Sequence, residues 1–103
     1  MSVVTIAGLN VDVNEEGYLT DSSQWNEQVA AEIAQEEEVE LTEKHFEVLN
    51  FLRDQHQNEV AITIRKVGKS GIIDIKGFYA LFPKKPLKKS SRIAGIPKPA
   101  SCV

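Results

Sequence analysis

The sequence predicts a mainly helical domain with a small β component: an N-terminal β-hairpin packed on a helical bundle, followed by a flexible C-terminal arm. Three observations predict this fold. Apolar residues recur at helical spacing over much of the chain, β-branched residues flank a Gly/Asn turn near its start, and two prolines interrupt its last eight residues. At 103 residues with 42% hydrophobic content, the chain suits one core. We therefore predict one domain over 1–95 and a mobile arm over 96–103.

The hairpin is expected at the start of the chain. Residues 3–6 and 11–13 are rich in Val, Ile and Thr, and residues 7–10 between them contain the Gly and Asn of a turn. A two-stranded ribbon is marginal alone, so it must pack on helices.

A first helix is expected over about 23–37. Asp21, Ser22 and Ser23 are candidate N-caps, and Trp25 begins a stripe of apolar side chains that recurs every four residues. This stripe should face the core, while the acidic run that ends the helix should be solvated.

A second helix is expected over about 42–57. Thr42 is its predicted N-cap, and Leu41 can pack on Phe46 as a hydrophobic staple. His45 and His56 both lie on this helix, but about 16 Å apart along its axis, so they cannot chelate one ion. With a single cysteine in the chain, no Cys/His set for a metal can be assembled, and no cofactor is predicted.

The segment from 60 to 82 is less uniform. Residues 60–67 alternate as in a strand, yet their length also suits a short buried helix, and both alternatives stay open. Residues 68–71 lack the first glycine of a phosphate-binding loop, which excludes that nucleotide site. Residues 72–82 are apolar on several sides and predict a buried helix that ends before Pro83.

A last short helix is expected to begin at Pro86 and to end at Gly95, with its lysine face exposed. Beyond it, Pro97 and Pro99 block both helix and sheet pairing, so residues 96–103 should form an extended, semi-stiff arm.

The net charge of −3 conceals an uneven distribution along the chain. Residues 1–59 carry about −12, and residues 60–103 carry about +9. Either the second half presents a basic face to an acidic protein groove or a nucleic acid, or the two halves complement each other within the fold. No apolar stretch is long enough to span a membrane and no signal peptide is visible, which predicts a soluble, cytoplasmic protein.

Cys102 is the only cysteine, so its thiol is free. An exposed thiolate can attack a persulfide and hold the transferred sulfur, and a proline-stiffened arm of eight residues reaches about 25 Å. Lys98 on the arm, with Lys88 and Arg92 one segment earlier, would favour the anionic forms of this sulfur. On position alone, Cys102 could equally be an incidental cysteine of a disordered end.

Several segments resemble one known family. At the C-terminal end these are the Leu-Phe-Pro of 81–83, the run Arg-Ile-Ala-Gly-Ile-Pro-Lys-Pro of 92–99 and the closing Cys-Val. Upstream they are residues 16–19, Trp25, and the blocks 41–46 and 51–54. Together they resemble the DsrC/TusE sulfur-relay family over nearly the whole chain. The resemblance implies a small helical domain with an N-terminal hairpin and a C-terminal arm, as expected above.

The resemblance also implies a role for the thiol. Family members that partner sulfite reductase carry a second cysteine where this chain has Ser91, so the sequence is similar to the one-cysteine, TusE type. Such members take sulfur from the TusBCD complex, whose counterpart is DsrEFH-like, and pass it to the tRNA 2-thiouridine-forming enzyme MnmA. The implied function is a sulfurtransferase that carries a persulfide on Cys102 and acts only with partners. Between Arg53 and Leu81 the chain is several residues shorter than the family pattern.

Two other functions remain open. The chain could partner a sulfite reductase or sulfur-oxidation proteins with a single thiol, or it could be a DNA-binding regulatory module that uses its basic second half. Copurification with a reductase would favour the first, and salt-dependent duplex binding that is indifferent to Cys102 would favour the second.

Overall fold

The computed structural model describes residues 2–97, so Lys98, Pro99 and Cys102 lie outside the described residues. The described part contains a two-stranded sheet, a short 3₁₀ turn and five α-helices, which confirms the predicted fold class. In chain order the elements are β1 (Ser2–Ile6), β2 (Leu9–Val13), η1 (Ser22–Gln24), α1 (Glu27–Glu36), α2 (Glu43–Gln57), α3 (Ile64–Gly68), α4 (Ile75–Leu81) and α5 (Pro86–Ile93).

The predicted hairpin is confirmed. β1 and β2 pair antiparallel, and the last residue of β1, Ile6, lies opposite the first residue of β2, Leu9. Only Ala7 and Gly8 form the turn, with φ angles of 53° and 79°. Positive φ at both central positions is the geometry of the tight hairpin turn whose twist matches that of the strands. The loop is therefore two residues shorter than the predicted 7–10.

The first helix begins later than predicted. Asp21 is indeed a cap, but of the 3₁₀ turn η1, and Trp25 then has extended backbone with a ψ of 143°. Asn26 caps α1 instead, because its side-chain oxygen accepts a hydrogen bond from the Val29 amide at 2.8 Å. The predicted start at Ser23 was wrong, since Trp25 leaves the helical path to reach a distant partner described below.

The second helix is confirmed as α2, with Thr42 as its N-cap. His45 Nδ1 accepts from the Thr42 amide at 3.1 Å, and its Nε2 lies 2.9 Å from the Leu81 carbonyl oxygen. The two contacts agree with a neutral ring that carries its proton on Nε2. The buried ring also packs edge-on against Phe82, so His45 joins α2 to the end of α4.

The segment after α2 combines coil with two short helices. Residues 60–63 have no regular structure, and α3 follows with Thr63 as its cap, which removes the strand alternative. Helix α4 starts three residues later than predicted because Asp74 caps it by accepting from the Gly77 amide. It is buried on one side only: Phe78 is fully buried, whereas Tyr79 is 44% exposed. The prediction of a wholly buried helix was therefore wrong.

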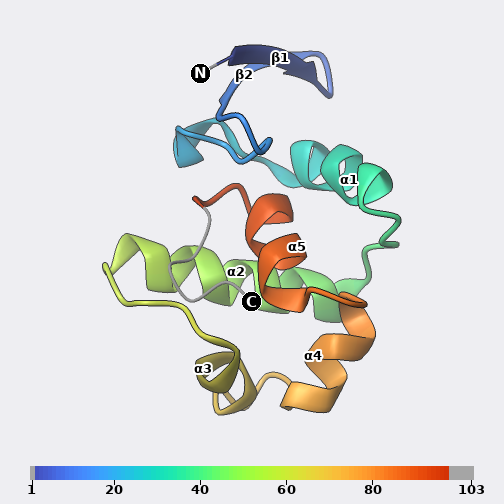
Figure 1. Ribbon diagram of the computed structural model, residues 1–103, viewed down its shortest axis with the longest axis vertical. Helices are drawn as coiled ribbons and strands as arrows, with labels where there is room; N and C mark the ends of the chain where they lie inside the picture. The colour runs from blue at the N-terminus through green and yellow to red at the C-terminus, as the bar shows by residue number, and fades with distance from the viewer. Residues whose placement is uncertain (1, 98–103) are drawn as a thin grey trace.

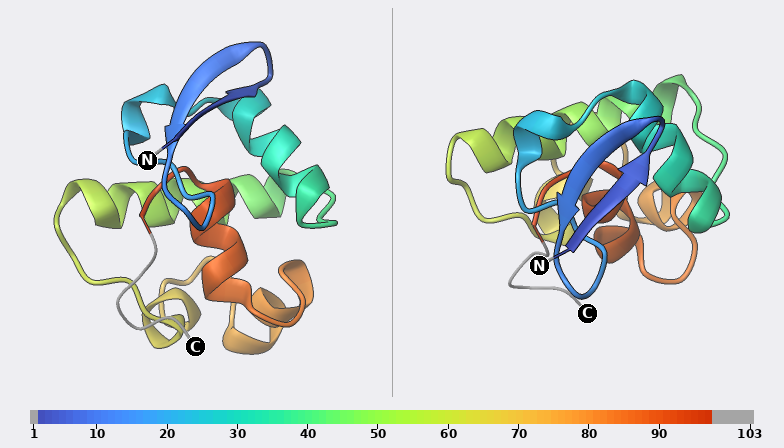
Figure 2. Two further views of the ribbon diagram at one scale, coloured as in Figure 1. Left: turned by 45° about the horizontal axis from the view of Figure 1, so that its top comes forward. Right: turned by 90° about the horizontal axis from the view of Figure 1, so that it is seen from above.

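Helix α5 confirms the last predicted helix and lies at the centre of the domain (Figure 1). Its lysine face is not fully exposed as predicted, because Lys88 and Lys89 are half-buried. It packs against α1, α2 and α4, while the hairpin lies at one end of the molecule, beside α1 (Figures 1 and 2). The buried apolar side chains form one cluster that draws on both strands and on every α-helix: Ile6, Val11, Val13, Leu19, Val29, Ala30, Ile33, Ala34, Val39, Val48, Leu49, Leu52, Val67, Phe78, Phe82, Leu87, Ile93, Ala94 and Ile96.

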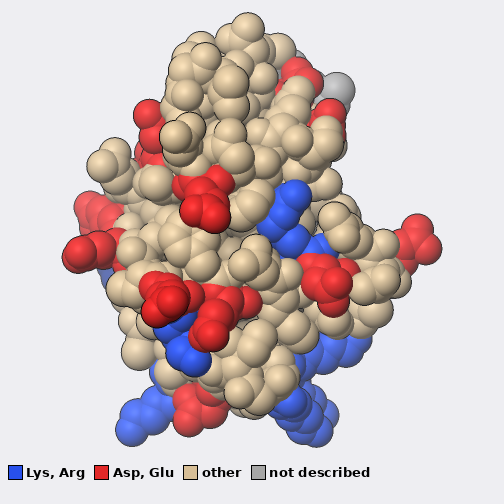
Figure 3. All heavy atoms as spheres, turned by 180° about the vertical axis from the view of Figure 1, so that it is seen from behind, with Lys and Arg blue, Asp and Glu red and all other residues tan. Residues whose placement is uncertain are grey.

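Charge is distributed unevenly over the surface. In Figure 3 the hairpin end is mostly uncharged, and most of the Lys and Arg side chains visible on that face lie toward the opposite end. Among the described helices, none is both long and apolar enough to cross a membrane.

Candidate functional site

The C-terminal end of α5 is the point from which the predicted arm departs. Ala94 is the C-cap, and Gly95 follows with a φ of 72°. The Gly95 amide donates to the Arg92 carbonyl at 3.2 Å, and the Ile96 amide donates to the Ser91 carbonyl at 3.2 Å. This pair of bonds is a Schellman motif, which requires the left-handed residue that glycine supplies.

The Schellman motif leaves two carbonyls at the end of α5 without a backbone donor. Two side chains from distant parts of the sequence donate hydrogen bonds to them. Trp25 Nε1 donates to the Ile93 carbonyl at 2.7 Å, and Arg53 Nη1 donates to the Ala94 carbonyl at 2.8 Å. Arg53 also donates to the Ser22 carbonyl at 3.1 Å, and its guanidinium carbon lies 4.3 Å from the centre of the Trp25 ring. We call Trp25, Arg53 and Gly95 together the arm clamp.

The charge at the C-terminal end of α5 favours the positively charged guanidinium of Arg53. The last carbonyls of a helix carry partial negative charge, which a guanidinium complements. Partial burial lowers the pKa of Arg53 from its usual value because desolvation penalises the charged form. Arginine nevertheless stays protonated in proteins, so the charge on the clamp is permanent.

The arm clamp also leaves no room for a side chain at Gly95. A Cβ built there would lie 2.5 Å from Trp25 Cδ1 and 2.8 Å from Trp25 Cβ, well inside van der Waals contact. Ile96 is fully buried and Pro97 is exposed, so the chain leaves the core between them. The arm clamp therefore fixes the backbone at the end of α5, directly before the buried Ile96 and the exposed Pro97.

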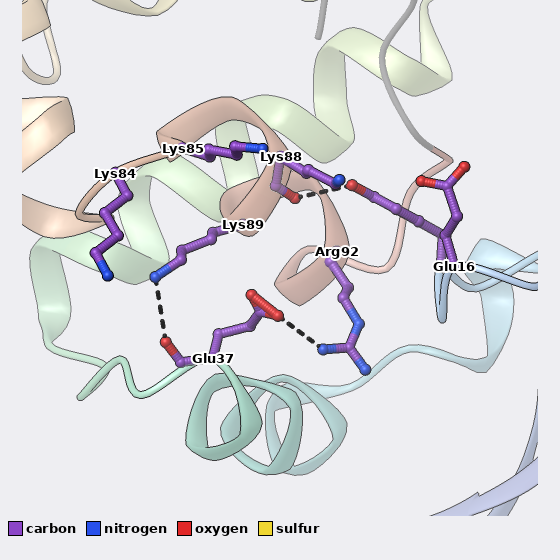
Figure 4. Close-up of a pocket in the computed structure, with 8 residues that line it drawn as sticks. Glu16, Glu37, Lys84, Lys85, Lys88, Lys89 and Arg92 are labelled. Carbon is purple, nitrogen blue, oxygen red and sulfur yellow. Dashed lines mark hydrogen bonds and ion pairs between the residues drawn. The ribbon is translucent and has the colours of Figure 1, made fainter. Parts of the chain in front are cut away.

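Two of the predicted supporting residues, Arg92 and Lys88, line a pocket of about 310 Å³ beside α5 (Figure 4), whereas Pro97 does not line it and Lys98 and Pro99 lie outside the described residues. Arg92 contributes to its wall but is held by neighbours: Nη1 contacts Glu37 at 2.9 Å, Nη2 contacts Glu36 at 3.2 Å, and Nε donates to the Gly17 carbonyl. Lys88 lines the same pocket. The residues that line it come from three segments: Glu16, Tyr18, Glu37, Lys84, Lys85, Lys88, Lys89 and Arg92.

Arg92 joins the two oppositely charged halves of the sequence, since Glu36 and Glu37 belong to the acidic half. The expectation that the halves complement each other is thus met at this point. It is not met at Lys84, Lys85 and Lys88, which form no ion pair within the described part of the chain.

Comparison with known proteins places the chain in a family. Residues 5–103 match the family model described as "DsrC like protein". The chain belongs to the DsrC family. It is 39% identical to the sulfurtransferase TusE homolog of Haemophilus influenzae, over 98% of this chain and 100% of that one. It is 38% identical to the sulfurtransferase TusE of Escherichia coli, over 93% and 95% of the two chains.

Solved structures of DsrC proteins have the same fold. The NMR structure of Allochromatium vinosum DsrC superposes with a TM-score of 0.82 at 36% identity, over 98% of this chain and 97% of that one. The oxidized gamma-subunit of the dissimilatory sulfite reductase from Archaeoglobus fulgidus superposes with a TM-score of 0.82 at 32% identity, over 99% and 100%.

Within this DsrC-family domain, the arm clamp is the feature that sequence reasoning missed. Trp25 was assigned to the apolar stripe of a helix, and Arg53 had no assigned role. The available signal was that both residues fall in the blocks that resemble the family. Among the described residues, no group of three or more His, Asp or Glu side chains is placed to hold a metal ion. The candidate site of this DsrC-family protein therefore comprises the arm clamp and the pocket beside α5.

Proposed function

We propose that this chain is a TusE-like sulfur-relay protein in which Cys102 accepts sulfur as a persulfide and transfers it to an acceptor protein. The observation that carries the proposal is the place of the only cysteine, seven residues beyond Gly95, in a chain that aligns over nearly its full length with proteins named sulfurtransferase TusE. A carrier needs a reachable thiol on an anchored arm more than it needs a pocket of its own.

The chemistry consists of two thiolate exchanges without net oxidation or reduction. The Cys102 thiolate attacks the outer sulfur of a donor persulfide; a new Sγ–S bond forms while the donor's S–S bond breaks, and the donor cysteine leaves as a thiolate. In the second step an acceptor thiolate attacks the terminal sulfur, and Cys102 leaves as a thiolate. Each step keeps the number of S–S bonds constant.

Each supporting residue has a distinct part in the proposal. Pro97 and Pro99 stiffen the arm, which limits the entropy lost when it enters a partner. Lys98 and Lys88 supply positive charge that favours the anionic persulfide. Arg92 has a structural part, because its guanidinium already faces Glu37 and Glu36.

The partners follow from the same proposal. The donor is a TusBCD- or DsrEFH-like protein, and the acceptor is an MnmA-like enzyme that thiolates tRNA. The protein acts as a sulfurtransferase only together with these partners.

The test is intact-protein mass spectrometry after incubation with a cysteine desulfurase, cysteine and relay donor proteins in buffer without reductant. The native chain should gain one sulfur atom that a thiol reductant removes, and Cys102→Ser should gain none. A matched control carries Cys102→Ser with Ala80→Cys, which places a thiol on the exposed surface of α4. Sulfur on Cys102→Ser, or equal loading of the relocated thiol, would contradict the proposal.

A second candidate is a DsrC-like partner of sulfite reductase or of sulfur oxidation. It is favoured by the likeness to the gamma-subunit from Archaeoglobus fulgidus. Ser91 argues against it, because a hydroxyl cannot join Cys102 in a disulfide. Affinity purification of the tagged chain separates the two: recovery of a reductase would favour this candidate, and recovery of sulfur-transfer proteins would favour the relay.

A further inference from the structure

We propose that the pocket beside the first turn of α5 is a docking site for a short acidic segment of a protein partner. The pocket is lined by Lys84, Lys85, Lys88 and Lys89 along the turn into α5 and its first turns. Figure 4 shows these lysines on one side and Glu37, which follows α1, on the other. The proposal deepens the relay function, because it states the chemistry by which a partner would recognise this domain.

The pocket carries an excess of positive charge. Five cations and two carboxylates line it, a formal excess of three. Arg92 is neutralised by Glu37 and by Glu36, which lies just outside the lining. Lys89 contacts only a backbone carbonyl, that of Glu37, at 3.4 Å. The unbalanced charge therefore lies on the lysine side.

The spacing of the lysines concentrates this charge. Lys85, Lys88 and Lys89 stand three and four residues apart at the start of α5, so their side chains share one face. Like charges at this spacing repel one another, and carboxylates of a ligand would relieve the repulsion. The N-terminal end of α5 adds positive potential, because no side chain caps it.

The surroundings of the pocket favour a short acidic peptide over a nucleic acid. Glu36 and Glu38, which flank the lining residue Glu37 in the sequence, are exposed, and the Glu36 side chain is 59% exposed. A duplex carries one charge per 1.7 Å of its axis and would extend from the lysines onto these carboxylates. A peptide segment with two or three acidic side chains can place its charges among the lysines, and the rest of the peptide can avoid the neighbouring carboxylates. A pocket of about 310 Å³ has room for side chains of that size.

The position of the pocket links docking to the thiol. Helix α5 has eight residues, so its two ends lie about 12 Å apart. The lysines of the pocket lie at and before the N-terminal half of α5, Arg92 lines the pocket from the last turn, and the arm clamp holds the C-terminal end. Cys102 follows the buried Ile96 by six residues, which span at most about 20 Å when extended. A partner that docks its acidic segment here therefore lies within reach of Cys102.

The first experiment is an NMR titration of the reduced, ¹⁵N-labelled full chain with a synthetic hexa-aspartate peptide. We expect the amide signals of residues 84–89 and of Glu37 to shift. The double variant Lys84→Glu/Lys88→Glu should weaken binding at least tenfold. The matched control is Lys69→Glu/Lys76→Glu, which changes the net charge equally at exposed positions of the α3–α4 region and should bind like the native chain.

Thermal melts should show that both double variants remain folded, and Lys84→Gln/Lys88→Gln replaces the first double if charge reversal unfolds it. If the two double variants weaken peptide binding equally, the binding reflects only the net charge of the protein, and the proposed docking site is wrong. Tighter binding of a short DNA duplex than of the peptide, lost in the same double, would make the pocket a nucleic-acid site instead.

A second experiment separates this proposal from the relay function. This experiment uses Lys84→Glu/Lys85→Glu, which reverses two lysines of the pocket and leaves Lys88 unchanged. This chain should take up sulfur on Cys102 from glutathione persulfide as fast as the native chain, but at least tenfold more slowly from a protein donor. Equal rates from the protein donor would overturn the docking site alone. A native chain that takes no sulfur from either source would overturn the relay function, whatever the peptide titration shows.

Discussion

The two ends of α5 differ in how completely their polar groups are satisfied. At the C-terminal end every carbonyl from Ser90 to Ala94 accepts a hydrogen bond, three from the following amides and two from Trp25 and Arg53. At the N-terminal end no side chain caps the helix, and Lys84, Lys85 and Lys88 form no ion pair within the described residues.

The difference indicates that the two ends of this short helix have different roles. Buried carbonyls without donors would cost free energy, so the hydrogen bonds at the C-terminal end stabilise the fold. Lysines that repel one another do not stabilise the fold, and this fits the docking role proposed above for the N-terminal end.

Gly95→Ala should disrupt the C-terminal end of α5. The left-handed backbone costs alanine about 1–2 kcal/mol, and the overlap of its Cβ with Trp25 adds a similar amount, so the free energy of unfolding should fall by about 3 kcal/mol. Urea unfolding measures it. Gly71→Ala is the control, because Gly71 also has positive φ but nothing within 4 Å of its Cβ position, and it should lose only about 1 kcal/mol. Equal losses would mean that Trp25 does not constrain Gly95.

Arg53→Met should open the arm clamp without changing the helix. The carbonyls of Ala94 and Ser22 lose their donor and Trp25 loses its cation, so unfolding should become easier by about 2 kcal/mol. Transfer of sulfur from a protein donor should slow, while loading from a small persulfide stays unchanged. Arg65→Met on exposed α3 should change stability by less than about 0.5 kcal/mol. A clamp variant as stable as this control would contradict the assigned role.

Two neighbouring buried serines in the middle of α5 allow a satisfied and an unsatisfied hydroxyl to be compared directly. Ser90 Oγ donates to the Leu87 carbonyl at 3.2 Å, whereas Ser91 Oγ is buried and has no hydrogen-bond partner among residues 2–97. Ser90→Ala should therefore cost about 1 kcal/mol, and Ser91→Ala should be neutral or stabilise by up to about 1 kcal/mol. Denaturant midpoints of the two variants, measured side by side, decide this; the reverse order would show that Ser91 has a partner.

The smallest expected effect depends on pH. Hydrogen bonds from the Ser23 hydroxyl and amide lower the pKa of Asp21 below its usual value. Asp21 therefore stabilises the fold above its unfolded-state pKa, and this contribution is lost as the pH falls through the lower, folded-state pKa. Asp21→Asn should be less stable than the native chain near neutral pH and approach it in stability as the pH falls below the lowered, folded-state pKa of Asp21. A gap that stays constant with pH would exclude the carboxylate as its cause.

Local signals predicted the elements whose causes are local. Thr42 at the start of α2, Pro86 at the start of α5 and Gly95 at its end each act through their own or adjacent backbone, and the structure confirms all three. Asp74 acts in the same way, but the apolar run around it hid its capping role.

The arm clamp could not be predicted in this way, because its causes are distant in the sequence. Trp25 has helical spacing with Val29, yet its indole donates to a carbonyl 68 residues away, which removes Trp25 from the helix. Nothing in the sequence distinguishes Arg53 from a surface arginine of α2. Its role becomes visible only when α5 is packed against α2, because Arg53 then donates to the Ala94 carbonyl. The pocket was foreseen only as a surplus of charge in one half of the chain.

The central position of α5 has a consequence for synthesis and degradation. Arg92 bonds to the Gly17 carbonyl across 75 residues, and Tyr18 to the Lys88 carbonyl across 70, so the helix made last ties down segments made first. A nascent chain without residues 86–96 lacks the middle of its own core and remains open to proteases. The core can therefore close only after residues 86–96 have been synthesised, so the domain folds as a whole and not from its N-terminal part onward.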